Sequence, residues 1–427
     1  MIKIYSDAKL AINEVLSRST AAPDVYKIVS DIINDVKTRG DKALFEYTEK
    51  FDGAKLSSLK VSEDEIKNAY SQVDNELIEI MKEAYENIKA YHIKQLRSGY
   101  EIKDGTKILG QKITPIEKVA LYVPGGTAAY PSTVLMNSIP AKIAGCEKIV
   151  IATPCNKNGE VKPAVLVAAD IVGVNEIYKI SGAQAIAALA YGTETIEPVY
   201  KIVGPGNVFV AEAKRQVYGK VNIDMIAGPS EILIVSDGTG DPKVVASDML
   251  SQAEHDKNAS AVLVTTSINF AKAVQSELEN CLEKLERCDI ARASIDNNGK
   301  IIVTDTIEEA INISNEIAPE HLEVFLDNPF DYLDSIRNAG SVFLGKNCPE
   351  PLGDYFAGTN HTLPTGSAAR FSSPLSVDDF IKKTSYTYYS SDDLKSVCRK
   401  VERFAKEEGL TAHAASAVVR FEGELNE

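Results

Sequence analysis

The chain has 427 residues, of which 44% are hydrophobic and 25% are charged. This length exceeds what one hydrophobic core usually supports, so we expect two or more domains. The 46 basic and 61 acidic side chains leave a net charge of -15, which opposes nonspecific binding to nucleic acid or anionic membranes and favours a small-molecule partner.

The N-terminal region, residues 1–117, is predicted to be helical and to pack with the second of two α/β units that follow. Apolar residues recur at helical spacing in DVYKIVSDIINDVKTRGDKALFEYTEKF and in NELIEIMKEAYENIKAYHIKQL. The first residues, MIKIYSDAKLAINEVL, lack a basic stretch followed by a long apolar core, and no later run is long enough to cross a bilayer. We therefore expect a cytoplasmic protein without a membrane partner.

From residue 118 the pattern changes to short apolar runs separated by glycine turns and by alanine-rich helical stretches. Such alternation predicts right-handed crossovers and mostly parallel sheets covered on both faces, which is the α/β fold class. We divide this body into a first unit, residues 118–229, and a second unit, residues 230–370. A Ser/Pro-rich segment, FSSPLSVDDFI, opens the remaining residues, 371–427, which are predicted to form a charged helical tail.

Several predicted strands of the first unit end in glycine-containing turns: VPGG (123–126), SGAQ (181–184), GPGN (204–207) and AGPS (227–230). Ligands of open α/β sheets bind beyond the carboxyl ends of the strands, where glycine permits close approach and helix amino termini favour anions. GPGNVF is a weak dinucleotide signature because Phe209 stands where GxGxxG has its third glycine. Ordinary strand-to-helix turns explain each of these stretches about equally well.

The cysteines and histidines differ in how they are placed. The six cysteines form no CxxC pair, so we interpret them as reduced packing residues rather than as a disulfide framework or a thiolate zinc site. Of the five histidines, His92 lies in an amphipathic helix, as a surface or packing residue. His255, His321, His361 and His413 each have a polar or carboxylate neighbour, and none lies in an apolar helical stripe.

Gln252 and His255 are one turn apart on a predicted helix, and Asp248 lies on the same side of its apolar stripe. With one histidine per element, no HExxH and no cysteine cluster, a metal site here would have to draw its ligands from distant segments. Nitrogen and oxygen donors of this kind suit zinc or a similar divalent ion. A solvated helix face explains the same spacing, so this alternative stays open.

Glu320 and His321 indicate a different chemistry. Adjacent side chains point in different directions, so the two cannot easily bind one ion, but one can accept a proton while the other orients water. Asp354, in a glycine-bounded loop, is either a ligand or a turn former. Glu408 and His413 lie near the end of the tail.

In chain order, the stretches VPGG, SGAQAIAALAYGT, GPGN, AGPSE, DMLSQAEHD, APEHLE, PLGDYFAGTNHTLPT and EGLTAH resemble the histidinol dehydrogenase family. The resemblance extends over nearly the whole chain. It implies a zinc enzyme that oxidises L-histidinol through L-histidinal to L-histidine, the last step of histidine biosynthesis, and reduces two NAD+ in succession. It also implies two incomplete Rossmann-like units with a small tail, which would explain the missing glycine fingerprint.

The resemblance also assigns roles to single residues. His321 takes the alcohol proton, and Glu320 activates the water that adds to the aldehyde. Ser230, His361 and Glu408 contact the substrate, together with this pair and the metal ligands. One zinc per subunit is bound by Gln252, His255, Asp354 and His413. NAD is bound by Tyr122, Gln184 and Asn207.

In this family the tail crosses to the partner subunit. The resemblance therefore implies a homodimer with shared active sites, in which Glu408 and His413 complete the site of the other protomer. Two other functions are compatible with the residues alone. One is a zinc hydrolase that uses Glu320 and a metal-bound water, and the other is a nonenzymatic binding protein with structural histidines. Reduction of a nicotinamide would distinguish the dehydrogenase from both.

Overall fold

The computed structural model describes residues 1–17, 25–125, 129–421 and 423, so Gly126 of the VPGG turn lies outside the described residues. The described chain packs into two compact units. The larger unit contains Met1–Gln95 and Ile116–Phe380, and the smaller unit contains Leu96–Pro115 and Ile381–Glu427. Each unit is thus assembled from two separate stretches of sequence.

The first sheet of the larger unit is five-stranded and parallel, in the order β6-β5-β4-β7-β8. Its strands are β4 (Lys118–Tyr122), β5 (Lys148–Thr153), β6 (Glu176–Lys179), β7 (Lys201–Val203) and β8 (Asn222–Ile223). The helices that connect them are α6 (Pro131–Ala144), α7 (Pro163–Val172), α8 (Gly182–Tyr191) and α9 (Val208–Val217). The strand order reverses between β4 and β7, which fits a Rossmann-like unit.

The second sheet is six-stranded and parallel, in the order β1-β11-β10-β9-β12-β13. Its strands are β1 (Lys3–Tyr5), β9 (Glu231–Ser236), β10 (Ser260–Thr265), β11 (Lys300–Val303), β12 (His321–Phe325) and β13 (Ser341–Leu344). Its helices are α10 (Pro242–Ala253), α11 (Ile268–Leu282), α12 (Cys288–Asn298), α13 (Ile307–Ile317) and the short α14 (Glu350–Tyr355). Strands β9 to β13 repeat the order of the first sheet, and β1 is added beyond β11.

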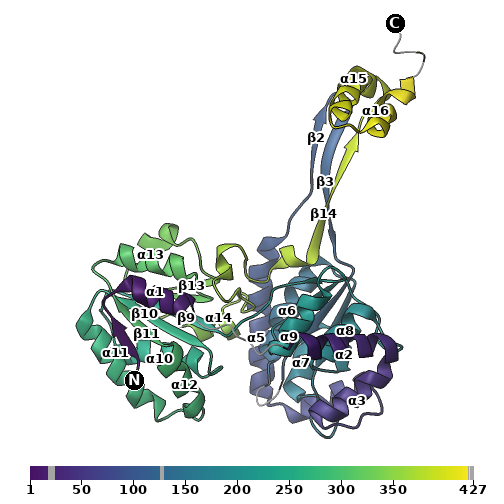
Figure 1. The fold of residues 1–427 in the computed structure, drawn as a ribbon. Helices are drawn as coiled ribbons and strands as arrows, with labels where there is room; N and C mark the ends of the chain where they lie inside the picture. Colours follow the sequence, from purple (N-terminus) through teal and green to yellow (C-terminus); the bar gives the residue numbers. More distant parts are fainter. Residues whose placement is uncertain (18–24, 126–128, 422, 424–427) are drawn as a thin grey trace. The chain divides into compact units, whose positions relative to one another are not determined.

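Both sheets have covered faces, which explains their sequences. β9 and β10 are buried along their whole length, so they are nearly continuous apolar runs rather than alternating ones. Helices pack against both faces, as the ribbon in Figure 1 shows for each sheet. Polar caps mark where the helices begin: Asn207 caps α9, Asp241 caps α10 and Thr306 caps α13.

The N-terminal region is divided between the two sheets. β1 pairs with β11, and α1 (Ala8–Leu16) packs on α13, so both belong to the second sheet. The helices α2 (Tyr26–Arg39), α3 (Asp41–Asp52), α4 (Glu63–Ala69) and α5 (Asn75–His92) instead contact the helices of the first sheet. This differs from our prediction, which placed the whole region with the second unit, because an amphipathic pattern shows that a helix needs a partner without showing which one.

The smaller unit contains the strands that the sequence analysis did not predict. β2 (Tyr100–Asp104), β3 (Lys107–Pro115) and β14 (Ile381–Tyr388) form an antiparallel sheet in the order β14-β3-β2. The helices α15 (Ser391–Glu407) and α16 (Thr411–Val418) follow β14 and pack on each other, at one end of the long strand ribbon in Figure 1. The predicted tail is therefore α-helical only from Ser391, because β14 and a short 3-10 helix, Val377–Phe380, come first.

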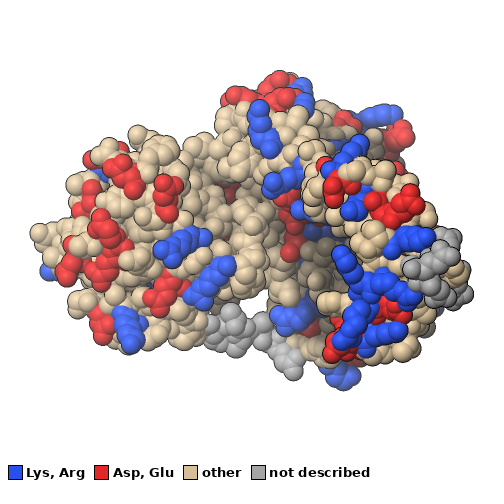
Figure 2. All heavy atoms as spheres, turned by 90° about the horizontal axis from the view of Figure 1, so that it is seen from above, with Lys and Arg blue, Asp and Glu red and all other residues tan. Residues whose placement is uncertain are grey.

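Charged side chains of both signs are interspersed on the face shown in Figure 2. Exposed pairs such as Lys27–Asp31 and Arg403–Glu407 are each worth only about 0–1 kcal/mol. All six cysteines are free, and the sequence analysis predicted no disulfide framework. No helix in the described part of the chain is long and apolar enough to cross a membrane.

Candidate active site

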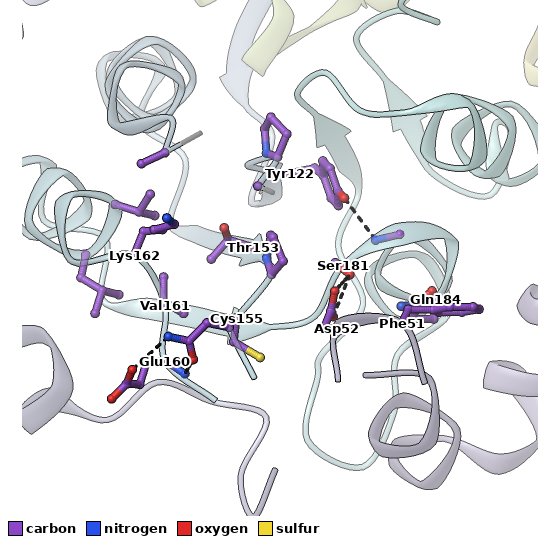
Figure 3. Close-up of a pocket in the computed structure, with 18 of the residues that line it drawn as sticks. Phe51, Asp52, Tyr122, Thr153, Cys155, Glu160, Val161, Lys162, Ser181 and Gln184 are labelled. Carbon is purple, nitrogen blue, oxygen red and sulfur yellow. Dashed lines mark hydrogen bonds between the residues drawn. The ribbon is translucent and has the colours of Figure 1, made fainter. Parts of the chain in front are cut away.

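A cavity of about 900 Å³ lies at the carboxyl edge of the first sheet (Figure 3). It is lined by the ends of β4 and β5 and by the turns that follow β6 and β7. This volume suits a large cofactor, since pockets for small molecules usually measure about 300–1,000 Å³. The position at the reversal of strand order is where open α/β sheets bind their ligands.

The three residues predicted to bind NAD all line this cavity. Tyr122 ends β4, and its hydroxyl accepts a hydrogen bond from the Gly182 amide at 3.1 Å. Gln184 is buried, and its Nε2 has no hydrogen-bond partner. Asn207 accepts hydrogen bonds at the start of α9 from the amides of Phe209 and Val210. An unpartnered buried amide that faces a cavity is typical of a ligand-binding group.

Asp52, which the sequence analysis missed, also lines the cavity. Its two carboxylate oxygens accept from the Ser181 hydroxyl at 3.0 and 2.9 Å, as Figure 3 shows. Burial raises the pKa of this carboxyl, and the hydrogen bond from Ser181 opposes the rise. Asp52 ends α3, far along the chain from every glycine turn, so no local motif could indicate it.

Glu320 and His321 lie at the opposite kind of edge, where β12 begins. The neighbouring strand β9 begins at Glu231, whose amide donates to Glu320 Oε2 at 2.9 Å. The carbonyl oxygen of Glu231 accepts from His321 Nδ1, also at 2.9 Å. The backbone N–H and C=O of a single residue, Glu231, therefore bond both side chains of the predicted catalytic pair.

This arrangement leaves His321 Nε2 as the free nitrogen. Because Nδ1 must carry a proton to donate to a carbonyl, Nε2 carries the lone pair in the neutral ring. Nε2 is buried without a hydrogen-bond partner, 3.7 Å from Asp354 Oδ1 and 3.8 Å from Glu350 Oε1. Burial lowers the pKa of His321, but the Glu320, Asp354 and Glu350 carboxyls outweigh it and raise the pKa to about 10.

Glu320 is buried more deeply than an acid usually is. Burial raises its pKa to about 8, and the nearby His321 ring opposes the rise. A carboxyl whose pKa lies near neutrality can exchange a proton with water during a reaction. Each group of the pair can accept a proton only in its deprotonated form, which for His321 requires that the negative charge of the neighbouring carboxyls be offset, as a bound cation would do.

Asp354 and Glu350 are one turn apart on α14. One ligand atom from each of His321, Glu350 and Asp354 lies within 4.8 Å of the others, a spacing that could hold a metal ion. Burial alone would raise the pKa of Asp354, but the nearby His321 and His361 rings outweigh it and lower the pKa to about 2. Of the predicted zinc ligands, the structure places Asp354 in this cluster.

Gln252 and His255, the other predicted ligands of the larger unit, lie close together along the chain. Gln252 is buried on α10, and its Oε1 has no hydrogen-bond partner. The helix ends at Ala253, so His255 lies in the following turn, where its amide donates to the Gln252 carbonyl at 3.2 Å. The side chain of His255 is exposed, but the protein around its ring displaces water and lowers its pKa. The charge of the Asp354 carboxylate acts in the opposite direction and raises the pKa. The predicted shared helix face is therefore a helix end and its turn.

His361 is tied to this site and to α6. One ring nitrogen, Nδ1, lies 3.1 Å from the Asp354 carbonyl oxygen, and the other, Nε2, lies 3.3 Å from Thr133 Oγ1. Burial lowers the pKa of the His361 ring. Ser230 immediately precedes β9, next to the residue whose backbone bonds the predicted catalytic pair. Both predicted substrate contacts thus border residues of the same cluster.

His92 is a packing residue, one of the two interpretations that its sequence position allowed. Its Nδ1 donates to Gln95 Oε1 at 2.7 Å, and its Nε2 lies 3.4 Å from Asn360 Nδ2. That Asn360 amide also donates to the Met136 carbonyl at 2.7 Å. The network fastens the segment that carries His361 to α5 and α6.

Glu408 and His413 belong to the smaller unit. Glu408 follows α15 and His413 lies on α16, and both side chains are exposed. The structure therefore groups Tyr122, Gln184 and Asn207 in the cavity of the first sheet and Glu320, His321, Asp354 and His361 in a cluster at the second, while Glu408 and His413 lie in a separate unit.

A family model described as histidinol dehydrogenase matches residues 16–421 of the chain. The chain belongs to the histidinol dehydrogenase family. The histidinol dehydrogenase of Clostridium acetobutylicum is 57% identical over 399 residues, which cover 93% of each chain. That of Bacillus cereus is 52% identical over 426 residues, which cover 99% of each chain.

A solved structure of the histidinol dehydrogenase from Elizabethkingia anophelis superposes with a TM-score of 0.94 at 40% identity. It covers 100% of this chain and 99% of that one. The predicted α/β fold class and the predicted resemblance to the histidinol dehydrogenase family are both confirmed. The chain is accordingly an enzyme of the dehydrogenase class.

This histidinol dehydrogenase family member also has a buried acid pair, Asp248 and Glu323, which the sequence analysis did not single out as a pair. Asp248 on α10 and Glu323 on β12 are hydrogen-bonded to each other, which requires that one of them keep its proton. Glu323 Oε1 also accepts from the Glu350 amide at 2.8 Å. Burial raises the pKa of Asp248 to about 6, and burial together with Asp248 raises that of Glu323 well above its usual range.

We predict that Asp248→Asn stabilises the protein at neutral pH. The pKa of Asp248 is about 6 in the folded state and 3.8 ordinarily, so the folded state binds a proton at this carboxyl more tightly than the unfolded state does. The stability of the folded state therefore falls as pH rises from about 4 to about 6. Asparagine removes that ionisation. The gain in unfolding free energy should therefore grow by about 1–2 kcal/mol between pH 5 and pH 8, measured by urea unfolding at constant zinc content. The exposed Asp334→Asn serves as control, and equal gains for Asp248→Asn at both pH values would contradict the explanation.

Proposed function

We propose that this chain is a zinc-dependent L-histidinol dehydrogenase that oxidises L-histidinol through L-histidinal to L-histidine with two NAD+. The observation that carries the proposal is the buried Glu320–His321 pair, held by the Glu231 backbone beside Asp354. Membership of the family supports the same substrate. A hydrolase could use Glu320 as well, but the large cavity at the switch point of the first sheet favours a nicotinamide dinucleotide.

In the first oxidation, His321 Nε2 would take the hydroxyl proton of the alcohol while the carbon-bound hydrogen leaves as hydride to the nicotinamide. Nε2 suits this task because Nδ1 is already fixed to the Glu231 carbonyl. Glu320 would then take a proton from the water that adds to the aldehyde, with Oε2 held by the Glu231 amide. Loss of a second hydride from the hydrate completes the carboxylate. Each step thus has a group that accepts its proton.

The residues fit a zinc ion. Gln252 Oε1 is buried without a partner, and Asp354 and His255 add the oxygen and nitrogen donors that zinc accepts. We propose Gln252, His255, Asp354 and His413 of the partner subunit as the ligands. Bound there, zinc would orient the imidazole and amine of the substrate. Ser230 and His361 of this chain, with Glu408 of the partner subunit, would complete the substrate contacts.

We propose NAD for the cavity of the first sheet, with Tyr122, Gln184 and Asn207 as its contacts. We retain 118–229 and 230–370 as the cofactor-binding and catalytic units, and 371–427 as the tail that reaches a second copy of the chain. Glu408 and His413 are exposed in the smaller unit, so both side chains can contact another molecule.

The stoichiometry of the reaction tests the function directly. With L-histidinol limiting and NAD+ in excess, we expect two NADH per L-histidinol consumed, measured by absorbance and by chromatography of the product. One NADH would indicate an enzyme that releases the aldehyde. No NADH from folded, zinc-loaded protein would contradict the assignment.

The separate roles of the pair predict separate defects. His321→Gln should lower the rate of alcohol oxidation by about 10²–10⁴-fold, because it removes the proton acceptor. Glu320→Gln should slow oxidation of supplied L-histidinal more than it slows the first hydride transfer. Single-turnover measurements with each substrate separate the two steps, and the exposed Glu316→Gln is the control. Equal defects of both variants in both steps would argue against divided roles.

Shared sites predict complementation between inactive variants. We expect a mixture of Glu320→Gln and His413→Ala proteins, after subunit exchange, to recover up to about a quarter of wild-type activity, because one hybrid site has both groups intact. Mixed dimers should be verified by mass spectrometry of tagged subunits. Absence of recovery in verified hybrids would place each complete site within one chain.

A further inference from the structure

The first sheet contains a buried ion pair that none of the proposed roles uses. Lys214 on α9 pairs with Asp224, which follows β8, and their side chains are only 2% and 1% exposed. Lys214 Nζ also donates to the Gly204 carbonyl at 3.0 Å, and the Gly204 amide donates to Asp224 Oδ2 at 2.7 Å. The pair therefore holds both polar backbone groups of a single residue.

Stability alone is a weak reason for such a pair. Removing two charges from water costs several kcal/mol per ion, and well-packed apolar residues of similar volume often stabilise a fold equally well. A buried ion pair does impose a geometry, because each charge must keep its partner at hydrogen-bond distance. The question is therefore which geometry this pair imposes.

Gly204 is the first residue of the GPGN turn, and its backbone has φ of 117°. A Cβ built at this position would lie 2.1 Å from the Tyr122 carbonyl oxygen, so the turn presses directly against the end of β4. Tyr122 on one side of this contact and Asn207 at the end of the turn both line the 900 Å³ cavity. A shift of Gly204 would therefore move the cavity wall on the side where the strand order reverses.

The far end of the turn is fixed by the same helix. Asn207 accepts from the Phe209 and Val210 amides at 3.1 and 3.2 Å as the cap of α9, and Lys214 extends from a later turn of α9 back to Gly204. Helix α9 thus holds both ends of the turn, and Asp224 supplies the third point of attachment.

We infer that Lys214 and Asp224 are positioning residues that fix the GPGN turn against β4 and so set the affinity for the nicotinamide dinucleotide without touching it. The inference rests on the proposed location of NAD in this cavity.

The matched neutral variant is Lys214→Met with Asp224→Asn. It leaves no unpaired buried charge, and the asparagine oxygen can still accept from the Gly204 amide. The interaction that is lost is the hydrogen bond from Lys214 to the Gly204 carbonyl. We expect KM for NAD+ to rise about tenfold, the effect of one lost hydrogen bond to a charged group, while KM for L-histidinol and the zinc content change by less than about twofold. Asp224→Asn alone, which keeps Lys214 in place, should give a smaller rise.

Lys201→Met is the control. Lys201 begins β7, at the opposite end of the strand from Gly204, and it pairs with Asp379 at 3.1 Å with a side chain only 4% exposed. It shares the burial and the ion pairing of Lys214 without contact to the turn, so it should lower the urea midpoint without raising KM for NAD+. If the double variant loses stability like Lys201→Met but keeps the wild-type KM for NAD+, the pair is only structural and the inference is overturned.

Variants of the cavity wall separate this inference from the proposed cofactor site. Gln184→Ala and Asn207→Ala should raise KM for NAD+ if the dinucleotide binds in the cavity. No rise for either would refute that location and the inference with it. A rise for both, with an unchanged value for the Lys214→Met and Asp224→Asn double variant, would refute the positioning role alone. Should the double variant not fold, Lys214→Gln with Asp224→Asn replaces it in the same comparison, because this pair is also neutral and glutamine is too short to reach the Gly204 carbonyl.

Discussion

The geometry of the proposed catalytic pair, Glu320 and His321, depends on the pairing of β9 with β12. In this parallel register His321 lies opposite Ile232, so the preceding residue, Glu231, is placed to bond Glu320 through its N–H and His321 through its C=O. A slip by one residue would turn every side chain of β12 to the other face of the sheet. The register is secured by burial of the whole of both strands. The chemistry of the site is thus fixed by the same hydrogen bonds and apolar contacts that build the sheet.

The two sheets of the larger unit share one strand order and use it differently. The first has its cavity at the carboxyl edge, beyond Tyr122, as expected for an open α/β sheet. The second presents Glu320 and His321 at the amino edge, where β12 begins. Burial at that edge sets the electrostatics, since it raises the pKa of Glu320 while the surrounding carboxyls raise that of His321. A repeated topology therefore does not repeat the location of a site.

Local patterns predicted the central strands of the two parallel sheets, the crossover helices and the glycine turns, because each follows from a few neighbouring residues, but they missed β2, β3 and β14 of the smaller unit. The residues alone pointed to Gln252 with His255 and to Glu320 with His321, whereas the family resemblance supplied Tyr122, Gln184 and Asn207 and assigned every role. Contacts between segments that are distant in the sequence could not be predicted, because no local pattern indicates them. Asp52 reaches the cavity from the end of α3, and the choice of sheet by α2 to α5 depends on packing partners that periodicity does not name. Glu350 was missed although it stands one turn before Asp354, a spacing that the sequence does carry.

The smaller unit draws its sheet from both ends of the chain: β2 and β3 precede the first parallel sheet, and β14 follows the second. A lone two-stranded hairpin is at best marginally stable in water. During synthesis β2 and β3 would therefore leave the ribosome long before the strand that completes their sheet, and the open edge of β3 would be exposed throughout. The small sheet can therefore be completed only late in synthesis, after β14 has been made. A product truncated before β14 has an unpaired edge on β3 that chaperones and proteases can bind.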